Sequence, residues 1–550
     1  MTDSTIYSFV VFTGTDMFSV RQSIRALMEA FPAARIVVLQ HSPQKSVQQL
    51  IKSQQRNFKR HGWRWIPYQG LEIVDRLGSK LRGSAEDCAP QVGIDFEKSA
   101  LIDNPRVNWQ IFCSIHDPQA LALVASVNPD LGISLAAPIL KPALFEIPKL
   151  GTLNVHKGKV PDYKGMPPAF WELKAGEKNV GCTVHFVSEK LDGGDVVSEA
   201  LVRVPPFATV KGMQLLLDPV GVRLVTEAAG DVLARRTLAK KQPTGGQTNT
   251  RPPLATEREL NRKLAIRTGK RSDIATRGKD AVFKTYGSAY APMRDIVRSS
   301  AASQHVIVLL YHRINDDLRD GVTNGIEQFD RHMAMLAKHT EVLRLSDLLD
   351  PAKRLGSSAK PKVIVTFDDG YEDNYSIAAP ILERHGVHAT FFVSTGLMGT
   401  NRGFEHDLSK LGRALPNMTW DQIRNLQRRG FEIGSHTVNH ARISTLSSEQ
   451  LQMELLDSKA TIERELGVNV RLFAYPFGGV DDSSTKANSA VFAAGYEMCC
   501  SAYGGRNDSI DLKNIKRSTI GFAHSDAAFW AIVRGFSKVR GRDEKALYEA

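Results

Sequence analysis

The sequence predicts an α/β protein with two globular halves. Its 550 residues exceed the size of one ordinary hydrophobic core and indicate two or three domains. Residues 6–12, 19–31 and 34–40 have the patterns of a strand, a helix and a strand, which is the start of a parallel sheet. In the C-terminal half, short apolar β-type runs alternate with helical stretches, and most of these runs end in a polar side chain. Chemistry at the ends of alternating strands is the layout of a β/α barrel.

The composition is that of a soluble globular protein, with 42% hydrophobic and 24% charged residues. No apolar run approaches the roughly 18 residues that span a bilayer, and the first residues lack the basic start of a signal peptide. The five cysteines are an odd number without ligand spacing, which predicts a reducing cytoplasm. Adjacent Cys499 and Cys500 are expected in a buried strand.

The net charge of +12 is concentrated in one segment. Residues 251–300 hold twelve Lys/Arg and five Asp/Glu, which leaves +7 in that segment. The segment lacks apolar periodicity and follows the turn-rich residues 242–253, so we expect a solvated, partly helical linker. Contact with an anionic membrane surface or with nucleotide phosphates is the alternative. The predicted domains are residues 1–240 and 301–550, joined by a basic linker over residues 241–300.

The strongest chemical signal lies at the ends of two apolar runs in the C-terminal half. Lys362-Val-Ile-Val-Thr-Phe-Asp-Asp-Gly370 ends in adjacent carboxylates, and a later run leads into His436-Thr-Val-Asn-His440. One carboxylate and two imidazoles form a metal triad that leaves a position open for water. The second carboxylate is then free to act as a base. Taken singly, an Asp-Asp-Gly turn or a His-x-x-x-His pair is more often structural.

This half resembles the polysaccharide deacetylase family of metal-dependent carbohydrate esterases, over about residues 306–522. The resemblance implies a distorted (β/α) barrel in which Asp369, His436 and His440 bind a divalent metal, with zinc the expected ion. It also implies that Asp368 is the general base acting on water. The metal and a backbone N–H after Pro476 would stabilise the oxyanion. The family's substrate-binding loop is matched by Tyr475, Pro476, Phe477 and Gly478.

Two features depart from the common deacetylase pattern. Most members supply the general acid from a Leu-x-His motif near the C-terminus, whereas here Leu310-Tyr-His312 precedes the Asp-Asp strand. This resembles the permuted branch of the family and implies His312 as the general acid; a structural histidine at a strand end is the alternative. The arginine that holds the catalytic base is replaced by Ala474, and Arg471 and Arg517 are the candidates to supply its charge.

The N-terminal half has its chemistry in Gly151-Thr-Leu-Asn-Val-His156 and in the turn Leu191-Asp-Gly-Gly194. On a strand, Asn154 and His156 project to the same face, where an amide and an imidazole suit oxyanion stabilisation and proton transfer. Asp192 in the turn can raise the basicity of the imidazole. From these residues alone, a structural Asn/His pair is the alternative. No Gly-x-Gly-x-x-Gly follows the first strand, so a dinucleotide site has little support.

This half resembles the folate-dependent formyltransferase family over roughly residues 6–235. The matching stretches are Leu153-Asn-Val-His156, Pro161-Asp-Tyr-Lys-Gly165, Val180-Gly-Cys-Thr-Val184 and Leu191-Asp-Gly-Gly194. The resemblance implies a Rossmann-like domain with Asn154, His156 and Asp192 as catalytic residues. It also implies 10-formyltetrahydrofolate as the formyl donor and a primary amine as the acceptor. Residues 135–140 fall where the family places its folate pocket.

The loop after the asparagine strand departs from the formyltransferase pattern. The family usually has His-Pro-Ser-Leu-Leu-Pro, whereas this chain has His156-Lys-Gly-Lys-Val-Pro161. The change is compatible with an acidic acceptor, such as a nucleotide-linked amino sugar whose phosphates meet Lys157 or Lys159. Solvated lysines are the alternative.

Together the halves predict a bifunctional, cytoplasmic enzyme of amino-sugar or glycan modification. Metal-dependent N-deacetylation exposes an amine, and folate-dependent formyl transfer consumes one. The expected partner is an amino sugar, a nucleotide sugar or an oligosaccharide, with no specific nucleic acid; a homo-oligomer stays open. The alternatives are a deacetylase whose N-terminal half only binds substrate, and a carbohydrate-binding protein with degenerate sites. A transfer-RNA acceptor has little support, because no separate RNA-binding domain follows residue 235.

Overall fold

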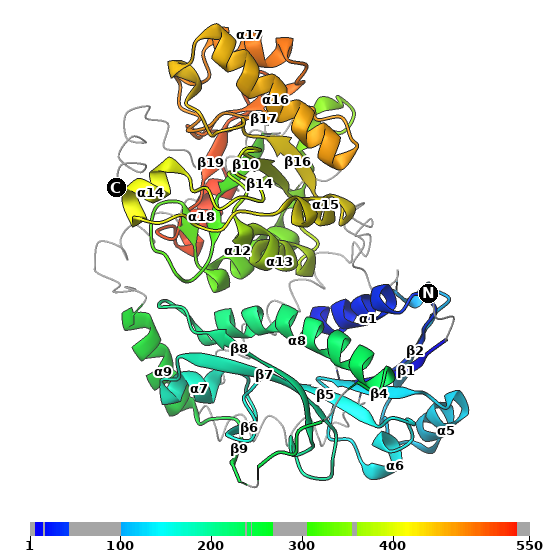
Figure 1. The fold of residues 1–550 in the computed structure, drawn as a ribbon. Helices are drawn as coiled ribbons and strands as arrows, with labels where there is room; N and C mark the ends of the chain where they lie inside the picture. Colours follow the sequence, from blue (N-terminus) through cyan, green and yellow to red (C-terminus); the bar gives the residue numbers. More distant parts are fainter. Residues whose placement is uncertain are drawn as a thin grey trace. The chain divides into compact units, whose positions relative to one another are not determined.

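The computed structural model describes residues 6–14, 17–42, 101–236, 239–243, 245–267, 305–354 and 360–535. Its contacts divide the chain into two compact units, of which the N-terminal one ends at Gly269 and the C-terminal one begins at Lys270 (Figure 1). Both units are of the predicted α/β class.

The N-terminal unit is built on a seven-stranded sheet. In sheet order the strands are β3 (Val107–Phe112), β2 (Arg35–His41), β1 (Ser8–Thr13), β4 (Leu131–Leu135), β5 (Thr152–His156), β7 (Asn179–Phe186) and β8 (Val196–Arg203). The first five pair in parallel, and β7 and β8 extend the sheet in the antiparallel direction. The order β3-β2-β1-β4-β5 is that of a doubly wound fold, which confirms the Rossmann-like prediction.

Helices cover both faces of this sheet (Figure 1). Because side chains alternate along a strand, β1 sends Phe9 and Val11 to one face and Val10 and Phe12 to the other. The first face carries α1 (Phe18–Ala30) and α8 (Val210–Leu233), and the second carries α5 (Pro118–Val127) and α6 (Pro142–Phe145). Burial on both faces explains why these strands are continuous apolar runs in the sequence.

The start of the predicted linker belongs to the N-terminal unit. β9 (Gln247–Asn249) pairs in parallel with β6 (Tyr163–Gly165), and α7 (Phe170–Ala175) follows β6 in the chain. α9 (Leu254–Arg267) follows, and its Leu260 and Leu264 are buried in the N-terminal core. The prediction of a solvated linker from residue 241 is therefore corrected, because two leucines one helical turn apart are enough to dock an otherwise charged helix. Residues 268–300 lie outside the described ranges.

The C-terminal unit is a parallel barrel that is nearly closed. In sheet order its strands are β18 (Met498–Cys500), β17 (Leu472–Ala474), β16 (Glu432–Ser435), β15 (Thr390–Val393), β14 (Lys362–Phe367), β10 (Val306–Tyr311) and β19 (Arg517–Thr519), with β13 (Glu341–Val342) beside β14. Every pair in this sheet is parallel. A bridge between Cys500 and Ile515 joins β18 to the residues just before β19, so the two edges of the sheet meet. The predicted distorted (β/α) barrel is confirmed.

Helices separate the strands of the barrel. They are α12 (Ile326–His339), α13 (Ala379–Arg384), α14 (Glu405–Leu411), α15 (Trp420–Arg428), α16 (Ser448–Leu466), α17 (Thr485–Ala493) and α18 (Asp526–Val533). Short elements complete the unit: β11 (Arg313–Ile314), β12 (Thr323–Asn324), the 3-10 helices Leu345–Leu349 and Ile443–Thr445, and the π-helix Asn374–Ala378. α16 begins with a capping box at Ser447 and ends at Gly467 with φ 68°.

Side chains alternate between the two faces of β14, and this places the Asp368 carboxylate on the face that lines the barrel interior. Ile364 belongs to an apolar cluster with residues of β10, β15, β17 and β18. Two and four residues later, Thr366 and Asp368 lie on the same face as Ile364. The interior of the barrel therefore changes from apolar to charged at the carboxyl ends of the strands.

Among the described residues, no helix combines the length and the apolar character that crossing a membrane requires. Cys113, Cys182, Cys499 and Cys500 are free thiols, and the last two are buried in β18 as expected. Cys88 lies outside the described residues.

Candidate functional site

The carboxyl ends of the barrel strands carry the residues predicted for the C-terminal site. His312 follows β10, Asp368 and Asp369 follow β14, His436 follows β16, and Tyr475 follows β17. β10 and β14 pair with Tyr311 opposite Phe367, and the N–H of Asp368 donates to the carbonyl of Tyr311 at 3.0 Å. Because parallel strands end at the same edge, side chains far apart in the chain meet here.

Asp369, His436 and His440 form a compact cluster. Their ligand atoms all lie within 4.8 Å of one another. Asp369 Oδ1 is 3.5 Å from His436 Nε2 and 3.2 Å from His440 Nε2. This carboxylate oxygen is buried and has no hydrogen-bond partner among the residues that the structure describes, an arrangement that a bound cation would satisfy. Two imidazole nitrogens and one carboxylate oxygen are a ligand set of catalytic zinc sites, so these residues fit a divalent metal ion.

The protein orients this ligand set before any ion binds. His436 Nδ1 lies 2.8 Å from the carbonyl oxygen of Ala474. A carbonyl only accepts, so Nδ1 carries the proton and Nε2 presents its lone pair to the cluster. Asp369, Thr437, His440 and Phe477 have left-handed φ angles of 74°, 65°, 56° and 62°. Non-glycine residues in that region are uncommon and gather at functional sites.

Asp368 is held by Arg517. The two guanidinium nitrogens Nη1 and Nη2 donate to the two carboxylate oxygens at 2.6 and 2.7 Å, and Arg517 is 0% exposed. Burial alone would raise the pKa of Asp368, but the guanidinium outweighs this and holds the pKa below its ordinary value. Arg471, the other candidate, pairs instead with Glu497 at the surface, where both side chains are more than 40% exposed. Arg517 therefore supplies the charge missing at Ala474.

His312 completes the C-terminal site. Its side chain is buried, and its Nδ1 has no hydrogen-bond partner among the described residues. Burial lowers the pKa of His312 to about 4, against the opposing fields of Asp369 and Asp368. The backbone carbonyl of His312 accepts from the Asn374 side chain at 2.6 Å, which anchors the strand end. The imidazole is consequently neutral at pH 7.

The N-terminal unit brings together the three residues predicted there and a fourth. Asn154 Nδ2 donates to Asp192 Oδ1 at 3.4 Å, and His156 Nδ1 is 3.4 Å from Asp192 Oδ2. His185, opposite Asn154 in the β5–β7 pair, places its Nε2 3.2 Å from Asn154 Nδ2 and 3.6 Å from Asp192 Oδ1. Burial raises the pKa of Asp192, but the imidazoles of His185 and His156 outweigh this and lower it. The carboxylate is therefore the centre of a buried polar cluster.

The ring of His156 is enclosed by the loop that follows it. His156 Nε2 donates to the carbonyl of Tyr163 at 2.7 Å, and burial lowers the pKa of His156 despite the nearby Asp192. A Cβ on Gly158 would lie 2.5 Å from His156 Nε2. The glycine stands where the formyltransferase pattern has serine, so its small size lets the loop approach the ring this closely.

The two lysines of this loop have different surroundings. Lys157 forms a half-buried ion pair with Asp218. Lys159 is about half exposed and lies 3.5 Å from Asp162, which is equally exposed. Lys159 is thus the better placed of the two to meet an anionic ligand, because surface ion pairs of this kind are weak.

Comparison with known proteins finds a different family in each unit. A model described as "Polysaccharide deacetylase" matches residues 356–498, and a model described as "Formyl transferase" matches residues 103–226. The chain contains a formyltransferase domain and a polysaccharide deacetylase domain. The deacetylase match ends before β19 and begins after β10, so His312 and Arg517 both lie outside it.

Relatives of both domains are found among curated proteins. YxkH of Bacillus subtilis (strain 168), named as a candidate polysaccharide deacetylase, is 29% identical over 194 residues, which are 35% of this chain and 62% of YxkH. Methionyl-tRNA formyltransferase of Pelotomaculum thermopropionicum is 32% identical over 149 residues, which are 27% of this chain and 47% of the relative. The chain thus spans less than two thirds of either relative's length.

Solved structures of both kinds are also similar to parts of the chain. Streptococcus pyogenes deacetylase PplD in complex with acetate is 23% identical with a TM-score of 0.34, and the match covers 41% of this chain and 96% of PplD. The formyltransferase PseJ from Anoxybacillus kamchatkensis, in complex with UDP-4,6-dideoxy-4-formamido-L-AltNAc and tetrahydrofolate, is 21% identical with a TM-score of 0.24. That match covers 28% of this chain and 81% of PseJ.

The predicted substrate loop of the deacetylase domain has two kinds of residue. Tyr475 is 1% exposed and donates its hydroxyl hydrogen to Asn488 at 2.8 Å, so its side chain belongs to the core. Of the other three residues, Phe477 contacts the cluster. The ring of Phe477 lies between His440, 4.9 Å away, and the guanidinium of Arg442, 3.9 Å away. Phe477 therefore packs the second histidine ligand from outside.

Glu454 on α16 contributes to the site of the deacetylase domain, and the sequence analysis did not identify it. Its Oε2 accepts the N–H groups of Val438 and Asn439 at 2.7 and 2.9 Å, and its Oε1 accepts from the Asn439 amide at 2.7 Å. One carboxylate thus fixes the turn between His436 and His440. No sequence pattern links a helix residue to a turn sixteen positions earlier, and the same is true of the cross-strand placement of His185 in the formyltransferase domain.

Proposed function

We propose that this chain is a bifunctional enzyme that changes the acyl group of an amino sugar. Its deacetylase domain removes an N-acetyl group in a metal-dependent hydrolysis, and its formyltransferase domain transfers a formyl group from 10-formyltetrahydrofolate to an amine. The observation that carries the proposal is the convergence of Asp369, His436 and His440 beside an Asp368 that Arg517 keeps charged. The free thiols support a cytoplasmic location.

Asp369, His436 and His440 would hold the cation of the deacetylase domain. A divalent ion such as zinc, when bound there, supplies a Lewis acid for the amide carbonyl and makes water more acidic. Asp368 stays ionised because of Arg517, and it accepts the proton of the attacking water. The bidentate pair also fixes the direction of the carboxylate, so this base does not rotate away from the reaction.

His312 is assigned the role of general acid, which delivers a proton to the leaving amine. Since burial keeps this imidazole neutral at pH 7, it does not bring a proton of its own and has to receive one during the reaction. Asp368, which takes the proton of water, acts electrostatically on His312 and is assigned as the source of that proton in the proposed cycle. The N–H of Phe477 makes no hydrogen bond within the described part of the chain, so it is assigned to the oxyanion.

In the formyltransferase domain, the Asn154 amide is assigned to the oxyanion and His156 to proton transfer, with Asp192 between them. The folate donor would carry the formyl group to this cluster. Deacetylation liberates the kind of amine that formyl transfer consumes, which links the two chemistries on one amino sugar.

The test uses the zinc-loaded full chain with UDP-N-acetylglucosamine and chitooligosaccharides, with and without 10-formyltetrahydrofolate. Acetate release reports the deacetylase, and mass spectrometry of the sugar reports formylation. We expect the double variant Asn154→Ala/His156→Gln to keep acetate release and to lose at least about 100-fold in formyl transfer. If the panel yields neither acetate nor an N-formyl sugar, the proposal is disproved.

A second candidate is a deacetylase whose N-terminal domain only binds the substrate. It is favoured by the engagement of His156 Nε2 with the Tyr163 carbonyl, because that nitrogen is not free to exchange a proton with an acceptor. In this case the double variant leaves every turnover number unchanged and alters only substrate binding, measured by calorimetry.

Glu454→Ala is expected to weaken zinc binding about 10- to 100-fold, because the turn between the two histidine ligands loses its acceptor. Competition with a fluorescent chelator measures the affinity. Asp457→Ala, an exposed carboxylate on the same helix, is the matched control and should leave zinc affinity unchanged. Equal affinities for both variants would show that Glu454 does not position the ligands.

A further inference from the structure

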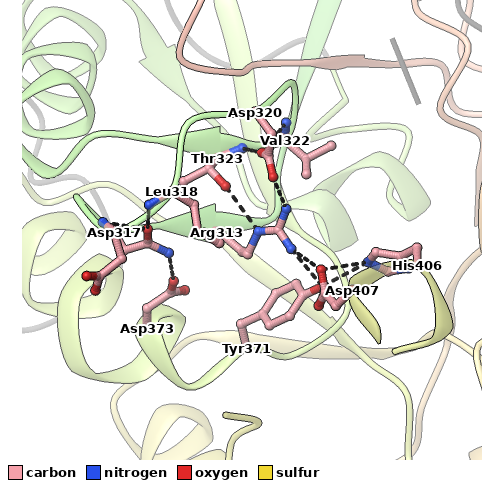
Figure 2. Close-up of polar contacts among 11 residues, drawn as sticks. Arg313, Asp317, Leu318, Asp320, Val322, Thr323, Tyr371, Asp373, His406 and Asp407 are labelled. Atoms are coloured by element: carbon pink, nitrogen blue, oxygen red, sulfur yellow. Dashed lines mark hydrogen bonds and ion pairs between the residues drawn. The ribbon is translucent and has the colours of Figure 1, made fainter. Parts of the chain in front are cut away.

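Figure 2 shows a polar network around Arg313 and Asp407 in the deacetylase domain. The network reaches the metal cluster through His406, whose ring lies next to that of His440. Arg313, directly after His312, forms a buried ion pair with Asp407 of α14 and a second pair with Asp320 at 2.6 Å. Tyr371, two residues after Asp369, donates its hydroxyl hydrogen to Asp407 Oδ2 at 2.7 Å. The network thus connects the strand ends that carry the proposed acid and a metal ligand to the helix α14.

This network determines which nitrogen of His406 carries the proton. His406 Nε2 lies 3.0 Å from the Tyr371 hydroxyl. The carboxylate of Asp407 is paired with Arg313 and can only accept, so the single hydroxyl hydrogen of Tyr371 points to Asp407. The remaining contact requires His406 Nε2 to donate to the Tyr371 oxygen. The neutral ring is therefore protonated on Nε2, and its Nδ1 is an acceptor.

His406 stands next to the metal ligands and is the most accessible imidazole there. Its ring centroid is 5.5 Å from that of His440, and its side chain is 29% exposed compared with 11% for His440. The connector between β15 and α15, which carries α14, is also tied down beside Asp369: Met418 N–H donates to the carbonyl of Gly370 at 2.9 Å. His406 is consequently held beside the cluster rather than on a free loop.

We propose that His406 sets sugar specificity by accepting, through Nδ1, a hydrogen bond from the hydroxyl vicinal to the acetamido group. This inference rests on the proposed deacetylase function. An acetamido carbonyl placed at Asp369, His436 and His440 brings the adjacent ring carbons within reach of a side chain that touches His440. A fixed acceptor there selects a donor, which a sugar hydroxyl provides and an O-alkyl or deoxy position does not.

The test compares UDP-N-acetylglucosamine and chitotriose with analogues of both that lack the 3-hydroxyl group. For the zinc-loaded wild-type chain, we expect kcat/KM to be about 3- to 10-fold higher with the hydroxyl present, the value of one neutral hydrogen bond. His406→Gln places its amide toward Tyr371 and has no acceptor at the Nδ1 position, so it should lose this preference. His406→Asn keeps an oxygen near that position and should retain part of it.

His385→Gln is the matched control. His385 is a half-buried imidazole bonded to Asp330 at 3.0 Å, outside the site, and this variant should keep the full preference. A preference that persists in His406→Gln, or one that is absent from the wild type, would overturn the inference. Nitrogen-15 spectra of the imidazoles, assigned with the His406→Gln variant, should place the proton on Nε2; a proton on Nδ1 would also overturn it.

Failure of the proposed function has a separate signature. If the wild-type chain hydrolyses neither the sugars nor 4-nitrophenyl acetate, the hydrolase itself is absent and the specificity inference falls with it. If 4-nitrophenyl acetate is hydrolysed and no sugar is, the metal chemistry stands and the assignment of a sugar hydroxyl to His406 is wrong.

Discussion

Replacing Arg517 by methionine is expected to destabilise the deacetylase domain by about 3–5 kcal/mol, because the buried Asp368 carboxylate loses its bidentate partner. Methionine fills much of the same space, so the effect reports the lost charge more than a cavity. Urea denaturation of the full chain at pH 7 measures it. The double variant Arg517→Met/Asp368→Asn should recover much of the loss, because it removes the uncompensated charge.

The pH dependence of this difference has a definite sign. In the wild type the pKa of Asp368 is lowered on folding, so its contribution to stability is present above the unfolded pKa of about 4 and is lost as the pH falls. In the variant, burial without the arginine raises that pKa and penalises the charged form. The stability difference between the two proteins should therefore be largest near neutrality. It should begin to narrow as the pH falls through the raised pKa of Asp368 in the variant, and it should narrow further below about pH 4, where the wild-type contribution is lost.

Arg471→Met is the control for the same residue change at the surface. Its partner Glu497 is well exposed, so the loss should stay within about 1 kcal/mol. A similar loss of stability for both variants would show that Arg517 does not carry the charge that Ala474 lacks.

Asp369→Asn is expected to abolish zinc binding in the micromolar range and to reduce acetate release by more than about 100-fold. The amide keeps the size of the carboxylate but removes the anionic ligand that faces both imidazoles. Calorimetric titration with zinc and an acetate assay measure the two effects, and formyl transfer should be unchanged because it uses another domain.

Asp373→Asn is the matched control for this substitution. Asp373 is a half-buried carboxyl group four residues later, bonded to Asn315 and outside the metal cluster. Burial raises the pKa of Asp373 to about 6. This variant should bind zinc like the wild type. Tight zinc binding by Asp369→Asn would remove the basis for the proposed hydrolase.

Local patterns were sufficient to predict several elements of both domains. The apolar runs before Asp368 and before His436 became β14 and β16 as expected, and Ser447 and Gly467 bound α16. These signals are local, since they depend on side-chain alternation and on capping within a few residues. The charged residues 251–267 were misjudged for the opposite reason: two buried leucines in α9 give a weak signal within a basic segment.

The sequence alone determined that a carboxylate pair and a histidine pair stand at strand ends, and that an asparagine and a histidine share one face of a strand. Which residues hydrogen-bond to these groups or pair with their charges was decided only by the tertiary structure. Closure of the barrel brings β19 beside β10, and so Arg517 rather than Arg471 reaches Asp368 across 149 positions of the chain. In the same way, strand pairing places His185 opposite Asn154, and the network around Arg313 sets the tautomer of His406. The physical reason is that a charge or a hydrogen bond acts over a few ångströms in space, whereas sequence patterns report only neighbours along the chain.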